Sequence, residues 1–150
     1  MKKLILVSMA LFLAIGISAK KYPTLSFKDL PIESQNFITN TFGVSSVKTV
    51  KEGPVKYEVE LRNGTEVQFY KNGSFKRAEA EKHQALPISV LNVLPANVKT
   101  YVSHKFGSWR LTDVEVKYSG KIEIELEKGK YEAELEFSRT GQLLKVDIDD

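Results

Sequence analysis

Two kinds of hydrophobic spacing follow one another along the chain after residue 30. Phe37, Ile38 and Phe42 recur at three- and four-residue intervals, which predicts one buried helix face. From residue 56 to 70 apolar and polar residues alternate, which predicts strands with one buried and one hydrated side, the hydrated side including Tyr70. Asn-Gly dipeptides at 63–64 and 72–73 are typical of hairpin turns. This part of the chain therefore predicts a helix followed by antiparallel strands.

The same order of patterns returns later in the chain. "LPIESQNFITNTFG" (30–43) resembles "LPANVKTYVSHKFG" (94–107), and "KYEVELRNG" (56–64) resembles "KIEIELEKG" (121–129). Self-similarity of this kind predicts a tandem repeat. We expect an α+β fold in which each repeat, 20–85 and 86–150, packs helices on a four-stranded antiparallel meander. The sequence leaves open whether the two sheets join into one continuous eight-stranded sheet.

Proline and glycine predict the ends of the two main helices. Pro31 and Pro95 suit a first helical turn, where the missing N–H needs no partner. Gly43 and Gly107 are expected to end the helices in the left-handed conformation. A shorter helical segment is expected before each main helix, at 26–30 and at 87–93.

Six glutamates alternate with apolar residues between residues 123 and 136. We predict a hairpin with Lys128-Gly129 as its two-residue turn, which places two pairs of glutamates directly opposite one another on the hydrated side: Glu125 with Glu132, and Glu123 with Glu134. Each pair of like charges costs up to about 1 kcal/mol. Stability alone would not select this arrangement.

Three interpretations of this glutamate face compete. The first is a hydrated sheet surface on which nearby lysines relieve the repulsion between the glutamates. The second is a binding surface for a basic protein or peptide, and the third is a site for catalysis or metal binding. Catalysis needs a desolvated carboxyl with a raised pKa, whereas these groups are expected to lie in water. Calcium needs six to eight converging oxygens, which a flat strand does not supply. The acidic tail at 147–150 is a weak calcium candidate or a frayed terminus.

Other residue types offer little support for an enzyme. His83 and His104 have no spaced ligand partner, and no nucleophile elbow or phosphate-binding glycine loop is present. We therefore predict no catalytic residue, no cofactor and no metal site. Two aromatic residues are candidates for an interface, Tyr70 on its strand and Trp109 after the second helix, although packing under a loop also explains Trp109.

The N-terminus predicts export from the cytoplasm. Lys2 and Lys3 precede an apolar run from Leu4 to Ile17 and small residues at Ser18 and Ala19, the layout of a signal peptide over residues 1–19. An uncleaved N-terminal anchor is the alternative. The chain has no cysteine, which excludes a lipoprotein anchor and disulfides. Without residues 1–19 the chain has 20 basic and 19 acidic side chains, a balance that does not favour nucleic acid as a partner.

The doubled Leu-Pro helix ending in Phe-Gly, followed by Tyr-Glu-Val-Glu-Leu and a glycine turn, resembles the secreted PepSY-like family of Bacteroidetes. That family is itself described as similar to β-lactamase-inhibitor proteins. The resemblance implies a tandem helix-plus-four-strand repeat, a periplasmic or secreted location and no assigned enzymatic activity. Related PepSY domains are thought to restrain secreted proteases, but no inhibitory residue of those proteins has a counterpart here, so inhibition is an analogy of fold.

These observations together predict a non-enzymatic, periplasmic or secreted protein-binding module, in its narrower form an inhibitor or regulator of a secreted enzyme. The expected partner is another protein outside the cytoplasm. The alternative is a structural or envelope-associated protein whose sheet face is inert. The candidate protein-binding residues are Tyr70, Trp109, Glu123, Glu125, Glu132, Glu134 and Glu136.

Overall fold

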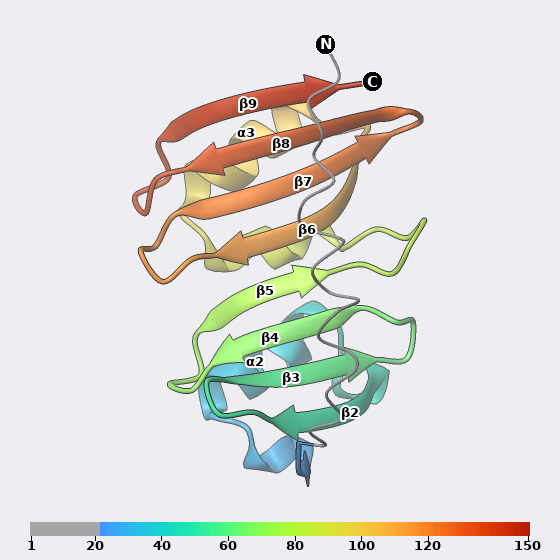
Figure 1. Ribbon diagram of the computed structural model, residues 1–150, viewed down its shortest axis with the longest axis vertical. Helices are drawn as coiled ribbons and strands as arrows, with labels where there is room; N and C mark the ends of the chain where they lie inside the picture. Colours follow the sequence, from blue (N-terminus) through green and yellow to red (C-terminus); the bar gives the residue numbers. More distant parts are fainter. Residues whose placement is uncertain (1–21) are drawn as a thin grey trace.

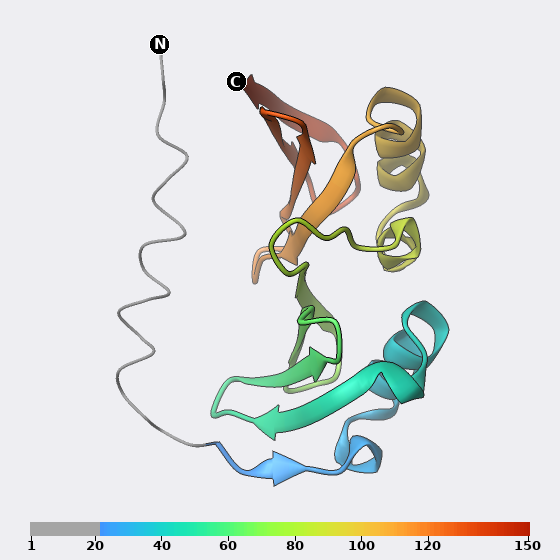
Figure 2. The same cartoon turned by 90° about the vertical axis from the view of Figure 1, so that its right-hand side faces the viewer.

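Nine strands pair in the order in which they occur along the chain, and every neighbouring pair is antiparallel. The computed structural model describes residues 22–150, so the predicted signal peptide at 1–19 lies outside the described residues. Helices pack on one side of the sheet (Figures 1 and 2). The α+β architecture and a single continuous sheet agree with the sequence prediction, but the sheet has nine strands where eight were expected.

Both halves of the chain run from helices into four consecutive strands. The first half contains β1 (Thr24–Leu25), η1 (Phe27–Asp29), α2 (Ile32–Thr41), η2 (Val44–Ser46), β2 (Val47–Glu52), β3 (Lys56–Leu61), β4 (Glu66–Tyr70) and β5 (Phe75–Glu79). The second half contains η3 (Ile88–Val93), α3 (Ala96–Lys105), β6 (Arg110–Val116), β7 (Ile122–Lys128), β8 (Tyr131–Phe137) and β9 (Leu143–Asp149). The 3-10 helices η1 and η3 confirm the expected short helical segments, and β1 is the additional strand.

The core lies between the sheet and the helices. Figure 2 shows α2 and α3 on the same side of the sheet, each over the strands of its own half. The alternation predicted for the strands is confirmed, because their inward side chains are at most 1 % exposed at Val59, Val67 and Phe69 in one half and at Ile124 and Leu135 in the other. Burial of these side chains is the main force that holds each helix to the sheet.

The helix ends differ in detail from the prediction. Pro31 and Pro95 cap the helices from the preceding, extended position instead of occupying the first turn. Gly43 ends α2 with a φ of +85°, as predicted. The prediction for Gly107 is wrong, since its φ is not in the left-handed region. Glycine is required at this position for a steric reason, because a Cβ there would lie 2.6 Å from the carbonyl oxygen of Ser103.

The hairpin of β7 and β8 turns one residue later than predicted. Its central residues are Gly129 and Lys130, flanked by the pair Lys128 and Tyr131, so the expected Lys128-Gly129 turn is wrong. Gly129 has a φ of +58°, which suits the first central position of a tight hairpin turn. The error shifts the register by two residues, so every side chain stays on its predicted side of the sheet.

The two halves are joined by backbone pairing between β5 and β6. Ala78 lies opposite Val114 on the buried side, while Arg77 lies opposite Glu115 and Glu79 opposite Asp113 on the other side. Ala78 and Val114 are both fully buried, so the core continues across this joint.

Tyr70 makes a second link across the same joint. Its hydroxyl donates a hydrogen bond of 2.6 Å to the backbone carbonyl of Val116 on β6. Its ring meets that of Tyr118 edge to face, with 5.0 Å between the ring centroids. Tyr70 therefore ties the end of β4 to the second half of the molecule.

We predict that Tyr70→Phe lowers the free energy of unfolding by about 1 kcal/mol, because it removes this one hydrogen bond and leaves the Val116 carbonyl without its donor. Urea unfolding followed by circular dichroism measures the change. The control is Tyr101→Phe, whose ring packs against Phe137 but whose hydroxyl has no hydrogen-bond partner among the described residues. A loss of stability as large in Tyr101→Phe as in Tyr70→Phe would contradict the assignment.

Candidate functional site

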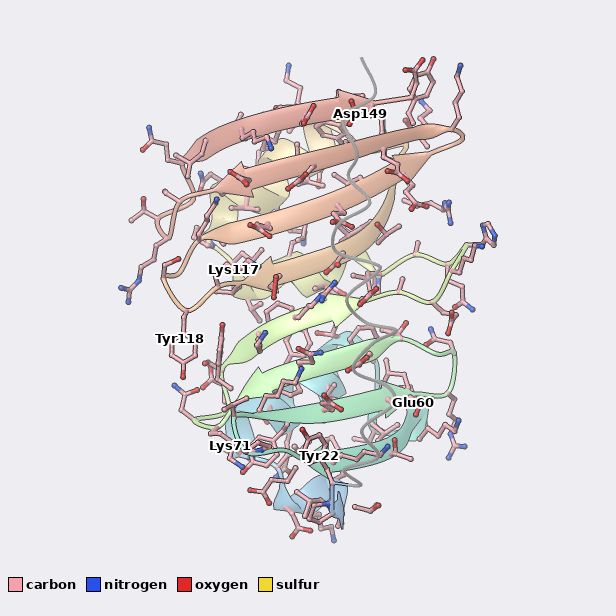
Figure 3. All side chains as sticks on the ribbon, in the orientation of Figure 1. Tyr22, Glu60, Lys71, Lys117, Tyr118 and Asp149 are labelled. Atoms are coloured by element: carbon pink, nitrogen blue, oxygen red, sulfur yellow. The ribbon has the colours of Figure 1, made fainter. Side chains whose placement is uncertain are left out.

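The side of the sheet that faces away from α2 and α3 is the open face. Within residues 22–150 no helix covers it (Figure 2). Figure 3 is viewed onto this face, with Glu60 and Asp149 marking strands near its two ends and Lys117 and Tyr118 at one margin. Its side chains are almost all charged, because each strand alternates apolar residues toward the core with polar ones toward this side.

One acidic side chain from each of seven consecutive strands lies opposite the next, forming what we call the acidic row. The strands are β3 to β9, so the row crosses the joint between the two halves. Directly opposed residues on adjacent strands have Cβ atoms about 5 Å apart. The acidic row consists of Glu60, Glu66, Glu79, Asp113, Glu125, Glu134 and Asp147.

Arg77 balances the centre of the acidic row. Its guanidinium forms a two-pronged contact with the carboxylate of Asp113 and lies 3.2 Å from that of Glu79. Asp113 is only 8 % exposed, and burial raises its pKa while the hydrogen bonds from Arg77 act in the opposite direction. Burial also raises the pKa of Glu79. Two carboxylates thus share one buried cation.

Glu125 and Glu134 continue the row without an ion pair of this kind among the described residues. They lie directly opposite each other, and in the described part of the chain no lysine or arginine nitrogen lies within 4 Å of either carboxylate. Burial, followed by the charge of Asp113, raises the pKa of Glu125 to about 7; Arg77 opposes this and Glu134 adds to it. The expectation that the glutamates of the hairpin all lie in water is therefore wrong for Glu125.

A second row, formed by Glu115, Glu123 and Glu136, runs beside the acidic row, and basic residues largely neutralise it. Lys117 lies 2.6 Å from Glu115 and 3.5 Å from Glu123, and Lys121 lies 3.1 Å from Glu136. Burial acts to raise the pKa of Glu115, but Lys117, Arg77 and Lys76 together outweigh it and lower that pKa. The predicted relief of glutamate repulsion by lysines is thus present in this row and absent at Glu125 and Glu134.

The structure brings the predicted glutamates together on one face but changes their partners. Glu125 pairs with Glu134 and Glu123 with Glu136, so the expected pairs Glu125–Glu132 and Glu123–Glu134 are wrong. Glu132 lies near the hairpin turn, opposite Glu127. Three glutamate pairs are formed where two were predicted.

The two aromatic candidates are not part of this arrangement. Trp109 packs against the core, with its ring 5.3 Å from that of Phe106, which confirms the packing interpretation and separates it from the glutamates. Tyr70 points outward as predicted, but it is partly buried against Val116 and Tyr118, and burial raises its pKa. Its hydroxyl is already used inside the molecule.

Sequence reasoning missed the central part of the acidic row. Glu79, Arg77 and Asp113 are brought together only by the pairing of β5 with β6, and residues 80–109 separate these strands along the chain. Neither "FKRAE" nor "RLTDVEV" alternates strictly, because a bulge in each strand leaves the buried residues three positions apart, Phe75 and Ala78 in one and Leu111 and Val114 in the other. The register across the joint was not available from either segment.

A cleft of about 1080 Å³ lies between the two halves. Residues of α2, η3 and the loops of both halves line it, including Asn36, Val55, Val93 and Tyr118, and its one carboxylate is Glu33. No residue of the acidic row lines this cleft. Within residues 22–150 no group of three or more side chains is arranged to hold a metal ion. No helix in this range is both long and apolar enough to cross a membrane.

Comparison with solved structures places the fold among proteins of Bacteroides. A Bacteroides thetaiotaomicron protein described as a "putative calcium-regulated periplasmic protein" is 25% identical, with a TM-score of 0.67 over 83% of this chain and 94% of that one. A Bacteroides vulgatus protein described as a "putative periplasmic protein from DUF2874 family" is 23% identical, with a TM-score of 0.69 over 86% of this chain and 98% of that one. The predicted location, periplasmic or secreted, is confirmed by these relatives.

Comparison with curated proteins gave no match. A family model described as "Putative beta-lactamase-inhibitor-like, PepSY-like" matches residues 17–77 and, in a second match, residues 55–145. The resemblance noted in the sequence is confirmed, and because the two matches cover most of its length, the chain belongs to the PepSY-like family.

Proposed function

We propose that the chain is a non-enzymatic binding module of the periplasm that holds a basic protein on its open face. The observation that carries the proposal is the acidic row, in which seven carboxylates on seven consecutive strands lie side by side. A basic partner supplies the positive charge that the row lacks at Glu125 and Glu134. Inhibition of a secreted enzyme is the narrower form of this proposal, and the family description supports it by analogy of fold.

The cost of the arrangement supports a binding role. Like charges directly opposite one another destabilise a sheet, by up to about 1 kcal/mol for each pair. The row contains six consecutive pairs of this kind. Arg77 compensates those at its centre, and Lys48 and Lys145 lie 3.3 Å from Glu60 and 3.9 Å from Asp147, which leaves Glu66, Glu125 and Glu134 without an ion pair among the described residues. A complementary potential on a partner converts this repulsion into attraction and speeds association.

The tandem repeat, with boundaries at 20–85 and 86–150, is part of the proposal. Both halves follow the order of 3-10 helix, α-helix and four strands, which supports a duplication. A joined pair of repeats supplies a wider face than one repeat alone, because the acidic row takes three residues from the first half and four from the second.

Charge reversal on the open face tests the binding role. We predict that Glu125→Lys with Glu134→Lys abolishes capture of the partner from a periplasmic extract, because two adjacent attractive charges become repulsive. The expected loss is at least ~10-fold, and capture by the unmodified chain weakens as salt is raised. The measurement is affinity capture followed by quantitative mass spectrometry.

The matched control reverses two exposed glutamates elsewhere, Glu33→Lys on α2 and Glu81→Lys in the loop after β5. It changes the net charge by the same amount and is expected to retain the partner. If the open-face variant keeps every partner while becoming more stable, the face is an inert surface, and the alternative of a structural or envelope-associated protein is favoured.

The raised pKa of Glu125, caused first by burial and then by the charge of Asp113, makes stability depend on pH. The pKa of Glu125 is raised from 4.5 to about 7, so between these values the folded state binds more protons than the unfolded state. The contribution of protonated Glu125 to the free energy of unfolding is therefore complete below about pH 4.5 and is lost as pH rises through 7.

We predict that Glu125→Gln is more stable than the unmodified chain by roughly 2 kcal/mol at pH 8 and similar to it at pH 5, because glutamine resembles the protonated carboxyl. Urea unfolding at both pH values measures the difference. Glu123→Gln is the control, since Glu123 has Lys117 as a partner and its removal should give no gain at pH 8. An equal gain in both variants would show that Glu125 is not specially desolvated.

A further inference from the structure

The last strand, β9, is an edge strand with one side unpaired. Six of its seven residues pair with β8, with a bulge at Leu144, and the strand order ends there among the described residues. The opposite edge of the sheet is different, because β2 is covered in part by β1, a strand of only two residues. An unpaired edge of this length presents a row of backbone donors and acceptors to another strand.

The inward side chains of β9 are unusually exposed. Val146 and Ile148 lie opposite Leu135 and Ala133, which are buried, yet they are themselves 42% and 51% exposed. Leu144 is 55% exposed. In the outer strand of the first half, by contrast, Val50 is 2% exposed. The second half thus leaves at its edge an apolar strip that the first half covers.

The sequence of β9 is complementary to itself in the antiparallel direction. If Val146 lies opposite Val146 of a second copy, Lys145 lies opposite Asp147 of that copy, and Leu144 lies opposite Ile148. The same pairs recur on the other side of the two-fold axis. Lys145 and Asp147 lie on the open face and Val146 on the helix side, so the central pairs keep both side chains on the same side of the sheet.

The neighbouring registers that also keep each side chain on its own side of the sheet are less favourable. A shift in one direction places Lys145 opposite Lys145 of the second copy, and a shift in the other places Asp147 opposite Asp147. Like charges directly opposite one another oppose strand pairing. The register centred on Val146 is the one of these three with only unlike charges opposed.

We propose that two copies of this chain associate through β9, in an antiparallel pair centred on Val146, so that the two sheets become continuous. The two open faces then lie on the same side. The association is independent of the acidic row's partner, since it uses the edge of the sheet and not its face. An interface made mainly by one strand is small, so the dimer is expected to be weak and dependent on concentration.

Sedimentation velocity from about 10 µM to about 1 mM measures the association. We expect the unmodified chain, without residues 1–19, to shift from monomer toward dimer with rising concentration. Lys145→Asp and Asp147→Lys should each weaken the dimer at least ~10-fold, because each places like charges opposite one another. Lys28→Asp, at an exposed position on η1, is the matched charge control and should dimerise normally.

Mixing the two disrupted variants distinguishes edge pairing from a general charge effect. One variant then has two aspartates at 145 and 147 and the other has two lysines, so the mixture restores both ion pairs. We expect a mixed dimer at least as stable as that of the unmodified chain. Recovery in the mixture also shows that both variants fold.

Single cysteines test the register, since the chain has no cysteine of its own. Val146→Cys should form a disulfide-linked dimer on mild oxidation, because the two copies of this residue face each other across the axis. Leu144→Cys, on the same strand, should not, because its counterpart lies opposite Ile148. The proposal is overturned if the unmodified chain stays monomeric at the highest concentration, if the charge variants dimerise unchanged, or if Leu144→Cys crosslinks as well as Val146→Cys.

Discussion

The pairing of β5 with β6 is the constraint on which the rest of the structure depends. It places Ala78 against Val114 in the core and so makes one continuous hydrophobic layer from two. On the open face the same register sets Glu79 beside Asp113. Without this joint the two sheets would each carry a short acidic row and an additional open edge, which is a site for unwanted strand pairing.

The joint brings acidic residues together and supplies the cation that makes this tolerable. Arg77 is largely buried, and although burial acts to lower its pKa, its contacts with Asp113 raise that pKa. A buried ion pair adds little net stability, because the desolvation of both charges offsets their attraction. Removing one partner alone is costly, however, since it leaves a buried charge uncompensated. Arg77 therefore favours the register that sets it beside Asp113, whereas its charge only partly offsets the burial and repulsion that raise the pKa of Glu125.

Hydrophobic alternation predicted which side of the sheet the residues of β3, β7 and β8 face, but not the residue that each lies opposite. The β7–β8 hairpin illustrates the difference, because a shift of two residues changes every pair and preserves every side. In β5 and β6 bulges interrupt the alternation. The helices were predicted from the spacing of Phe37, Ile38 and Phe42, and the conformation of Gly107 was missed because a steric requirement and a left-handed one both select glycine. The charges that act on the pKa of Glu125 come from both halves, since Arg77 and Glu79 lie in the first and Asp113 and Glu134 in the second, and no local segment contains them all.

The two ends of the sheet show how similar halves come to have different roles. At the first end, β1 pairs with β2, and Leu25 and Phe27 pack on the core, so the outermost long strand has its apolar side buried. At the second end nothing among the described residues plays this part, and β9 keeps an exposed apolar side together with a free backbone edge. Edge strands are commonly protected by charged residues that are poorly matched to a neighbour. The charges of β9 do not act in this way, since Lys145 and Asp147 are placed to match a second copy of the strand, and so they direct pairing toward one partner instead of preventing it.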